Sequence, residues 1–119
     1  AYNTLTEVAE EIKAGESVLI FPEGTHSLDG SVGKFKDGGF RLALDCSTPV
    51  LPIAICGSHK IMPKFSWIIN PQKVFVAIGQ PIHFEKHTKR SSEDYDSALN
   101  NVRGSILDMH RELEKKALL

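Results

Sequence analysis

The apolar positions in the first fifteen residues have the spacing of an amphipathic helix. They recur at intervals of three and four residues and so form one stripe: Leu5, Val8, Ala9 and Ile12. Thr4 and Glu7 stand three positions apart at the start of this pattern and form a capping box, so the helix is predicted to begin there. Gly15 follows the last apolar position and predicts a left-handed C-terminal cap.

Three later apolar runs lack helical spacing and predict short buried strands, at residues 18–21, 50–55 and 73–78. A polar, glycine-rich loop over 23–39 and a short apolar helix over 40–44 separate the first two runs. Two strands joined in this way favour a right-handed βαβ unit, which belongs to a parallel sheet. The predicted fold class is therefore α/β, with a small mixed or mainly parallel sheet and flanking helices.

Pro52 limits where the second of these strands can lie. Proline has no amide hydrogen to donate to a neighbouring strand, so we expect this strand at a sheet edge or at a bulge. The turn at 79–81, Gly-Gln-Pro, ends the third strand.

The last apolar stripe predicts a long C-terminal helix over about 92–116. Its members again repeat at threes and fours: Tyr95, Leu99, Val102, Ile106, Met109 and Leu113. Ser91 and Asp94 form a second capping box in front of it. His110 stands beside Arg111, and we expect it on the solvated flank of this helix.

Composition excludes several classes of protein but does not indicate a function. The chain has 119 residues, of which 41% are hydrophobic and 24% charged, so it fits one globular domain and not a disordered segment. A net charge of −1 gives no general attraction to nucleic acid, and no nucleic-acid partner is expected. No apolar run approaches the roughly 18 residues of a membrane-spanning helix, and no signal peptide is expected at the start. Cys46 and Cys56 are expected to be reduced and structural.

Candidate chemistry concentrates in residues 21–27, Phe-Pro-Glu-Gly-Thr-His-Ser. This segment leaves the first predicted strand at its carboxyl end, where open α/β sheets bind their ligands. It combines a carboxylate, a glycine that permits close backbone approach, and two hydroxyl groups. Cations that would suit a phosphate follow shortly after it: Lys34, Lys36 and Arg41. Backbone amides near the next helix start would add to such a phosphate seat. The alternative is a solvated loop whose charges face water.

Residues 21–27 resemble the Phe-Pro-Glu-Gly-Thr-Arg-Ser motif of the glycerolipid acyltransferases. Three later segments are similar to elements of that family in the same order and spacing. Residues 34–40 resemble its Phe-Lys-x-Gly-Ala element, residues 50–55 its Val-x-Pro-Val-x-Ile block, and residues 78–82 its Gly-x-Pro-Ile turn. The resemblance extends from about residue 4 to about residue 83. It identifies the chain, over 1–119, as the C-terminal portion of an acyltransferase domain.

The resemblance implies transfer of a fatty acyl group to the free hydroxyl of 1-acyl-glycerol 3-phosphate, a step of phospholipid biosynthesis. Acyl-CoA or acyl carrier protein would be the co-substrate, and no cofactor is implied. The family's general base is a histidine in a His-x-x-x-x-Asp motif, and none of the five histidines here has an aspartate five positions later. The isolated chain is therefore predicted to be inactive, with no catalytic residue of its own and no metal.

Substrate-binding residues are implied by the motif matches. In the family the 21–27 motif is assigned to the glycerol-phosphate acceptor and the later proline to the acyl-chain side. His26 stands where the family has an arginine, whose fixed charge and forked geometry suit phosphate. The residues expected to bind substrate are Glu23, Gly24, Thr25, His26, Ser27, Lys34, Lys36 and Pro52.

The implied partners are a lysophospholipid acceptor, an acyl donor and a membrane surface, which would place the protein at the cytoplasmic face of a membrane. A small sheet with an open edge also predicts self-association. The main alternative is a non-catalytic phospholipid- or phosphate-binding module that keeps the acceptor pocket. A purely structural domain is a third interpretation.

Three other features have their own alternatives. Residues 61–69 are apolar and irregular, and either cover the sheet or contact an acyl chain or lipid. His83 and His87 are spaced like metal ligands on a helix, but they follow a turn and lack evident further ligands, so no zinc site is expected. His59 follows the second predicted strand and is expected to be an ordinary loop histidine.

Overall fold

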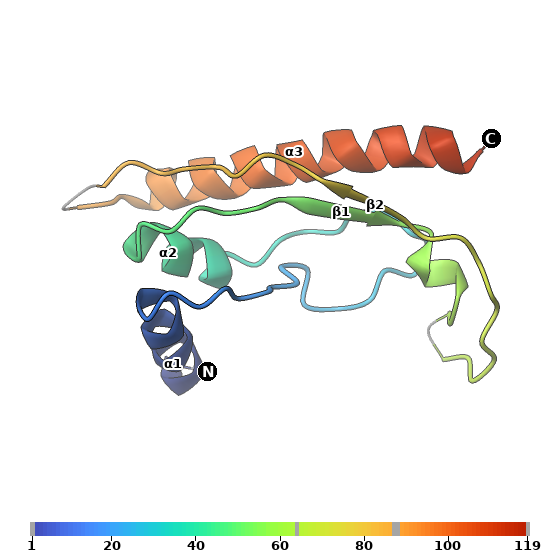
Figure 1. The fold of residues 1–119 in the computed structure, drawn as a ribbon, viewed down its shortest axis with the longest axis horizontal. Helices are drawn as coiled ribbons and strands as arrows, with labels where there is room; N and C mark the ends of the chain where they lie inside the picture. The colour runs from blue at the N-terminus through green and yellow to red at the C-terminus, as the bar shows by residue number, and fades with distance from the viewer. Residues whose placement is uncertain (1, 64, 87–88, 119) are drawn as a thin grey trace.

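The computed structural model describes residues 2–63, 65–86 and 89–118, and it is an elongated α/β arrangement built along one long helix (Figure 1). The elements, in chain order, are α1 (Tyr2–Lys13), α2 (Gly38–Asp45), β1 (Ile53–Cys56), the 3₁₀ turn η1 (Ser58–Lys60), β2 (Phe75–Ile78) and α3 (Ser92–Ala117). The α/β class with a small sheet and flanking helices is thus confirmed.

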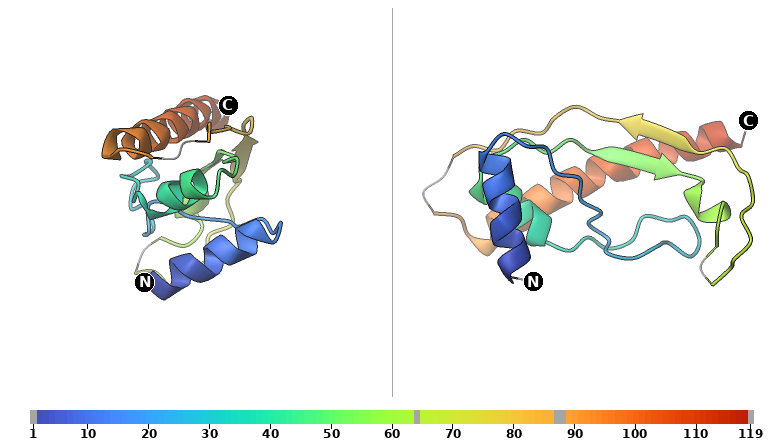
Figure 2. Two further views of the ribbon diagram at one scale, coloured as in Figure 1. Left: turned by 90° about the vertical axis from the view of Figure 1, so that its left-hand side faces the viewer. Right: turned by 60° about the horizontal axis from the view of Figure 1, so that its bottom comes forward.

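The core lies between α3 and one face of the two-stranded sheet. Ala54, Cys56 and Leu113 form its centre, and Phe75, Ala77, Ile106 and Met109 pack around them. Alternate residues of a strand point to opposite faces, so the intervening apolar side chains project away from α3. Ile55, Val76 and Ile78 are exposed on that second face. Figure 2 shows α3 running along one side of the sheet.

The pairing within the sheet differs from the βαβ prediction. β1 and β2 are antiparallel, with Ile53 opposite Ile78 and Cys56 opposite Phe75, and an isolated bridge joins Val50 to Ile82. Pro52 lies immediately before β1, where its missing amide hydrogen costs no ladder bond, and its carbonyl accepts from the amide of Gly79 at 2.9 Å. The strand predicted over 50–55 thus begins only at Ile53 and does not include the proline, but it is an edge strand as expected, since within the described residues it pairs with β2 alone.

The predicted strand over 18–21 is wrong. The described structure has no strand there, and the side chains of Val18, Leu19 and Phe21 are exposed. A strand exists only when a neighbour accepts and donates its backbone hydrogen bonds, and β1 makes its described ladder with β2 instead. Ile20 nevertheless packs over α2, because a Cβ placed on Gly39 would lie 3.0 Å from its Cδ1.

The short helices follow their local patterns. α2 forms where the 40–44 helix was predicted, and it buries Phe40, Leu42, Ala43 and Leu44. α1 ends as predicted, with Gly15 at φ +95° and its amide bonded to the carbonyl of Ile12 at 3.0 Å. Its start was predicted wrongly: the helix already includes Tyr2, so Thr4 lies within the first turn rather than at the cap.

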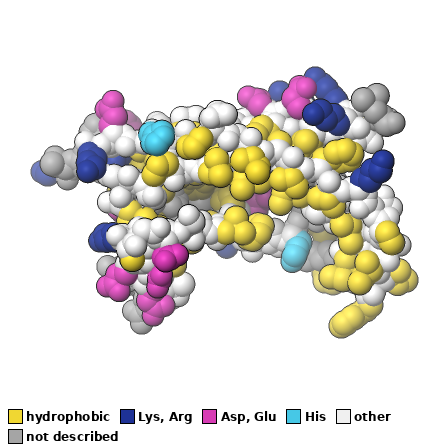
Figure 3. Space-filling model, viewed as in Figure 1, with side chains coloured by type: hydrophobic (Ala, Val, Ile, Leu, Met, Phe, Trp, Pro, Cys, Tyr) yellow, Lys and Arg dark blue, Asp and Glu magenta, His cyan; other side chains and the backbone are white. Residues whose placement is uncertain are grey.

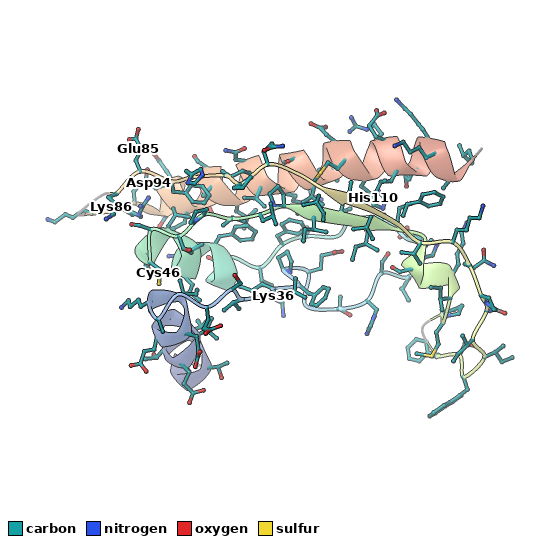
Figure 4. The ribbon with its side chains drawn as sticks, in the orientation of Figure 1. Lys36, Cys46, Glu85, Lys86, Asp94 and His110 are labelled. Carbon is teal, nitrogen blue, oxygen red and sulfur yellow. The ribbon has the colours of Figure 1, made fainter. Side chains whose placement is uncertain are left out.

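α3 begins at the predicted capping box. The Ser91 hydroxyl accepts from the amide of Asp94, and the Asp94 carboxylate accepts from the amide of Ser91 at 2.7 Å. The expectation for His110 is wrong, because its side chain is buried between α3 and the sheet (Figure 4). Position 110 is four residues after Ile106 and eight after Val102, so it belongs to the same buried stripe. Its Nδ1 lies 3.6 Å from Oε1 of Glu114.

Both cysteines are free, and Cys56 is buried in the core. Burial raises the pKa of the Cys56 thiol, since the thiolate is disfavoured away from water. Among the helices of the described ranges, none combines the length and the apolar character needed to cross a membrane. Self-association stays a prediction.

Candidate functional site

The loop between residues 22 and 36 is closed at its neck by backbone hydrogen bonds. The amide of Lys36 donates to the carbonyl of Pro22 at 2.8 Å, and the amide of Gly24 donates to the carbonyl of Phe21 at 3.1 Å. We call residues 22–36 the acceptor loop, after the substrate that the motif resemblance predicts for it. In Figure 1 it is the blue-to-cyan segment that runs beneath the sheet. A closed neck means that side chains far apart in the loop keep a fixed relation to each other.

Glu23 braces the loop from the inside. Its Oε2 accepts a hydrogen bond from the amide of Gly33 at 2.8 Å, across ten residues of chain. A Cβ at Gly33 would lie only 3.2 Å from that oxygen, so glycine leaves room for the carboxylate. A hydrogen bond to a charged group contributes about 1.5–3 kcal/mol. Glu23 therefore shapes the site whether or not it also touches a substrate.

The backbone conformation of Gly24 favours glycine at this position. Its φ is +70°, a conformation that L side chains rarely adopt. A Cβ there would also lie 2.9 Å from the ammonium nitrogen of Lys36. The Lys36 side chain thus passes directly over the Gly24 backbone, in the middle of the molecule (Figure 4). Lys36 of the 34–40 segment therefore contacts Gly24 of the 21–27 motif, and both were predicted to bind substrate.

The far end of the loop is a hydrogen-bonded turn around Ser27. The Ser27 hydroxyl accepts from the amide of Gly30 at 2.8 Å and donates to Oδ1 of Asp29 at 3.3 Å. The same Asp29 oxygen accepts from the Ser31 hydroxyl at 2.6 Å and from the Ser31 amide at 2.9 Å. These bonds, the Ser31 hydroxyl first, lower the pKa of Asp29 below its ordinary value. Ser27 therefore stabilises the turn at the far end of the loop.

Two residues from other elements hold the loop in place. The His59 ring of η1 packs against Gly30, so closely that a Cβ at Gly30, whose φ is +85°, would overlap the imidazole. Arg103 of α3 donates through Nε to the carbonyl of Gly33 at 3.2 Å. Its guanidinium carbon also lies 5.7 Å from the centre of the Phe35 ring. The sequence pattern identified neither contact, since both depend on elements that are distant along the chain.

The loop encloses one side of a depression of about 350 Å³. Its lining combines hydroxyl groups, an imidazole, two carboxylates and a lysine, all from one segment: Glu23, Thr25, His26, Ser27, Leu28, Asp29, Ser31, Gly33 and Lys34. Five of the residues predicted to bind substrate are therefore brought together here, and Gly24 and Lys36 adjoin them. Such a set can hydrogen-bond a polyol and attract a phosphate through lysine.

Two predicted residues lie elsewhere. Pro52 is fully buried beside Gly79, with its Cγ 3.0 Å from where a Cβ of that glycine would be, and it does not line the depression. Its assignment to the acyl-chain side stays a prediction. Arg41 turns toward α3: its Nε contacts Oδ2 of Asp37 at 2.7 Å, and its guanidinium lies 4.5 Å from the centre of the Tyr95 ring.

Metal binding has no candidate among the residues that the structure describes, which contain no cluster of three or more suitable ligands. Of the two histidines with metal-ligand spacing, His83 is exposed and His87 lies outside the described residues.

Known proteins are similar to this chain in sequence and in fold. A family model described as Acyltransferase matches residues 1–56. The chain is 46% identical over 83 residues to a chloroplastic 1-acyl-sn-glycerol-3-phosphate acyltransferase of Brassica napus, covering 69% of this chain and 24% of that protein. It is 43% identical over 82 residues to the 1-acyl-sn-glycerol-3-phosphate acyltransferase of Pseudomonas aeruginosa, covering 69% of this chain and 32% of that protein.

A solved structure agrees with this relationship. The crystal structure of the 1-acyl-sn-glycerophosphate acyltransferase PlsC from Thermotoga maritima superposes with a TM-score of 0.78 and 34% identity, over 92% of this chain and 44% of that one. The chain thus spans less than half the length of each of these three relatives. Sequence and fold agree on one relationship, and the chain belongs to the glycerolipid acyltransferase family.

Proposed function

We propose that this chain supplies the acceptor-binding part of a 1-acyl-glycerol-3-phosphate acyltransferase. The supporting observation is the depression of the acceptor loop, where the motif residues Thr25, His26 and Ser27 lie together with Lys34. The hydroxyl and imidazole groups would hydrogen-bond the glycerol, and the lysine would attract the phosphate. The similar proteins of Brassica napus and Pseudomonas aeruginosa are named 1-acyl-sn-glycerol-3-phosphate acyltransferases.

Acyl transfer also needs a base that removes the acceptor's hydroxyl proton and donors that stabilise the oxyanion. We propose that this chain alone lacks the first of these, since no histidine has an aspartate five positions later. The acyl group would come from acyl-CoA or acyl carrier protein. On this proposal the isolated chain binds the acceptor headgroup and transfers nothing.

Calorimetric titration with glycerol 3-phosphate tests the binding half of the proposal. The expected result is saturable binding that weakens at least about fivefold in Lys34→Gln, since a close cation contributes on the order of 1 kcal/mol to phosphate binding. Lys73→Gln is the matched control, because Lys73 is an exposed lysine that does not line the depression. Equal affinity for glycerol and glycerol 3-phosphate would contradict a phosphate seat.

Thiol release from acyl-CoA in the presence of lysophosphatidate tests the catalytic half. The chain alone should release none above background. A longer form of the protein that contains a His-x-x-x-x-Asp segment should release thiol, and Glu23→Ala should stop it. Unchanged turnover in that variant would show that the reaction does not depend on the acceptor loop.

A non-catalytic phosphate-binding module is the second candidate function, because the depression at the acceptor loop could bind a phosphate group without any catalytic base. Binding of glycerol 3-phosphate without turnover in every longer form of the protein would establish it. We further propose that the protein works at the cytoplasmic face of a membrane, because a lysophospholipid acceptor resides in a bilayer.

A further inference from the structure

The segment between η1 and β2 forms an apolar projection at one end of the molecule (Figure 1). We call residues 61–63 and 65–70 the apolar tip. Its large apolar side chains are exposed: Met62, Phe65, Trp67, Ile68 and Ile69. Trp67 is 98% exposed and Phe65 is 92% exposed, more than any other large apolar side chain described. The sequence allowed this segment either to cover the sheet or to contact lipid, and in the structure it does not cover the sheet.

The apolar tip is a built loop. The amide of Asn70 donates to the carbonyl of Ile61 at 2.6 Å, which closes the loop at its base. Inside it, the amide of Ser66 donates to the carbonyl of Pro63 at 2.9 Å, and the Ser66 hydroxyl accepts from the amide of Ile68 at 3.2 Å. Because the backbone bonds itself in this way, the aromatic and branched side chains are carried outward together.

The two chain segments that lead into and out of the tip, at Gly57 and Lys73, also contact each other closely. Gly57, at φ +94°, enters η1 so close to the other limb that a Cβ there would lie 2.7 Å from the carbonyl oxygen of Lys73. Only glycine permits this approach together with that φ. The tip is therefore held at a set position relative to the sheet.

Along the sequence, the charged residues on either side of the tip have one sign of charge. The sequence contains no aspartate or glutamate from residue 46 to residue 84, while Lys60, Lys64 and Lys73 all lie in this stretch. The whole chain has a net charge of −1, so its acidic residues are concentrated elsewhere. Figure 3 shows apolar side chains gathered at this end, and acidic ones over α1, along α3 and at the opposite end of the molecule.

We propose that the apolar tip inserts into the interface of an anionic phospholipid bilayer. Trp67 has the amphipathic ring that concentrates at the headgroup level of a bilayer. Phe65 and the isoleucines would reach the boundary with the acyl chains. Lys60 and Lys73 are exposed beside the tip and would contact anionic headgroups. A protein partner would not need a stretch so free of acidic groups, whereas an anionic surface excludes them.

The opposite, exposed face of the sheet does not compete as the membrane contact. Ile55, Val76 and Ile78 are apolar and exposed there as well, but they lie on paired strands and none of them is aromatic. Of these two exposed apolar surfaces within the described residues, the tip is the one that combines projection, aromatic rings and flanking lysines.

Fluorescence tests the proposal directly, because Trp67 is the chain's only tryptophan. The 119-residue chain is titrated with vesicles of phosphatidylglycerol and phosphatidylcholine, and its folding is checked by circular dichroism. The emission of Trp67 should shift to the blue, and acyl chains that carry bromine should quench it. Vesicles of phosphatidylcholine alone should bind more weakly, and added salt should weaken the binding to anionic vesicles.

Variants locate the contact. Ile68→Ser together with Ile69→Ser should weaken vesicle binding by at least about tenfold, which is the range for losing two buried aliphatic side chains. Lys60→Gln should weaken it about fivefold on anionic vesicles and reduce the salt dependence. Leu19→Ser is the matched control, since Leu19 is 72% exposed against 69% for Ile68 and lies outside the tip.

Three outcomes would overturn the proposal. They are an unshifted Trp67 emission on anionic vesicles, a loss in Leu19→Ser equal to that in the isoleucine variant, and a blue shift without lipid that accompanies dimerisation in sedimentation. The proposal goes beyond the proposed acyl transfer and does not require it. Binding of glycerol 3-phosphate, measured without vesicles, tests the proposed function, and its result does not depend on whether the tip binds vesicles.

Discussion

Arg103 and Gly33 are seventy residues apart, and the side chain of the first donates to the backbone carbonyl of the second at 3.2 Å. The same guanidinium reaches the carbonyl of Val32 through Nη2 at 3.4 Å. α3 thus packs on the sheet with its apolar stripe and holds the acceptor loop with an arginine from an adjoining position. Through this contact the helix that organises the fold also fixes the shape of the candidate site.

Arg103→Ala is expected to loosen the acceptor loop. It removes two charge-assisted bonds to backbone carbonyls, so the free energy of unfolding should fall by about 1–3 kcal/mol. Affinity for glycerol 3-phosphate should fall severalfold, because the lining residues lose their fixed relation. Urea unfolding and calorimetry measure the two effects. Arg111→Ala is the control, since Arg111 is exposed on the same helix; a similar loss there would show that Arg103 acts only through helix stability.

Glu23 provides a second test of loop architecture. Glu23→Ala leaves the half-buried Gly33 amide without its acceptor, which should cost about 1–3 kcal/mol in unfolding free energy. Glu23→Gln keeps an oxygen that can accept the bond and should cost less. Denaturant unfolding of the two variants distinguishes them. If the two substitutions cost the same, the Glu23–Gly33 bond does not stabilise the loop.

Gly30→Ala should be strongly destabilising for two separable reasons. The residue is at φ +85°, which costs a residue with a side chain about 1–2 kcal/mol, and its new Cβ would overlap the His59 ring. In the background of His59→Ala the overlap disappears and only the backbone cost remains. Gly38→Ala is the matched control, because a Cβ there meets nothing within 4 Å.

A double-mutant cycle of Gly30→Ala and His59→Ala gives the coupling between the two residues. We expect the cost of Gly30→Ala to be smaller by about 1 kcal/mol or more once His59 is shortened, the usual range for residues in contact. Additive costs would mean that η1 does not press on the acceptor loop.

His26→Arg is expected to preserve or tighten binding of glycerol 3-phosphate. Arginine is always charged and offers phosphate two parallel donors, and His26 lines the depression, where such a side chain has access. Titration calorimetry measures the change, with His83→Arg as the control because His83 is exposed and does not line the depression. A large loss of affinity in His26→Arg would show that the histidine itself is needed.

Local rules in the sequence predicted much of this molecule. The capping box of Ser91 and Asp94, the left-handed end at Gly15 and the apolar face of α2 each depend on neighbours within a few residues. The residues of the 21–27 motif also lie together because they are close in the chain.

The failures depended on non-local partners. Residues 18–21 have the composition of a strand, but a strand requires a hydrogen-bonding neighbour that composition does not specify. His110 was assigned from its charged neighbour Arg111, whereas its distance along α3 from Val102 decides its burial. The contribution of Arg103 to the acceptor loop came from a contact across seventy residues, which no pattern along α3 indicates.

The two cysteines should differ in reactivity. Cys46 is half-buried, whereas Cys56 lies in the core, where burial raises the pKa of its thiol and keeps it protonated. A disulfide reagent at pH 8 should therefore modify Cys46 first, and Cys56 only at the rate of unfolding. Above its ordinary pKa the Cys56 thiol loses its proton in the unfolded chain before it does so in the folded one. Folding stability should consequently fall as the pH rises through this range, and less so in Cys56→Ala. Equal modification rates for both thiols in the folded chain would contradict the packing of Cys56 against α3.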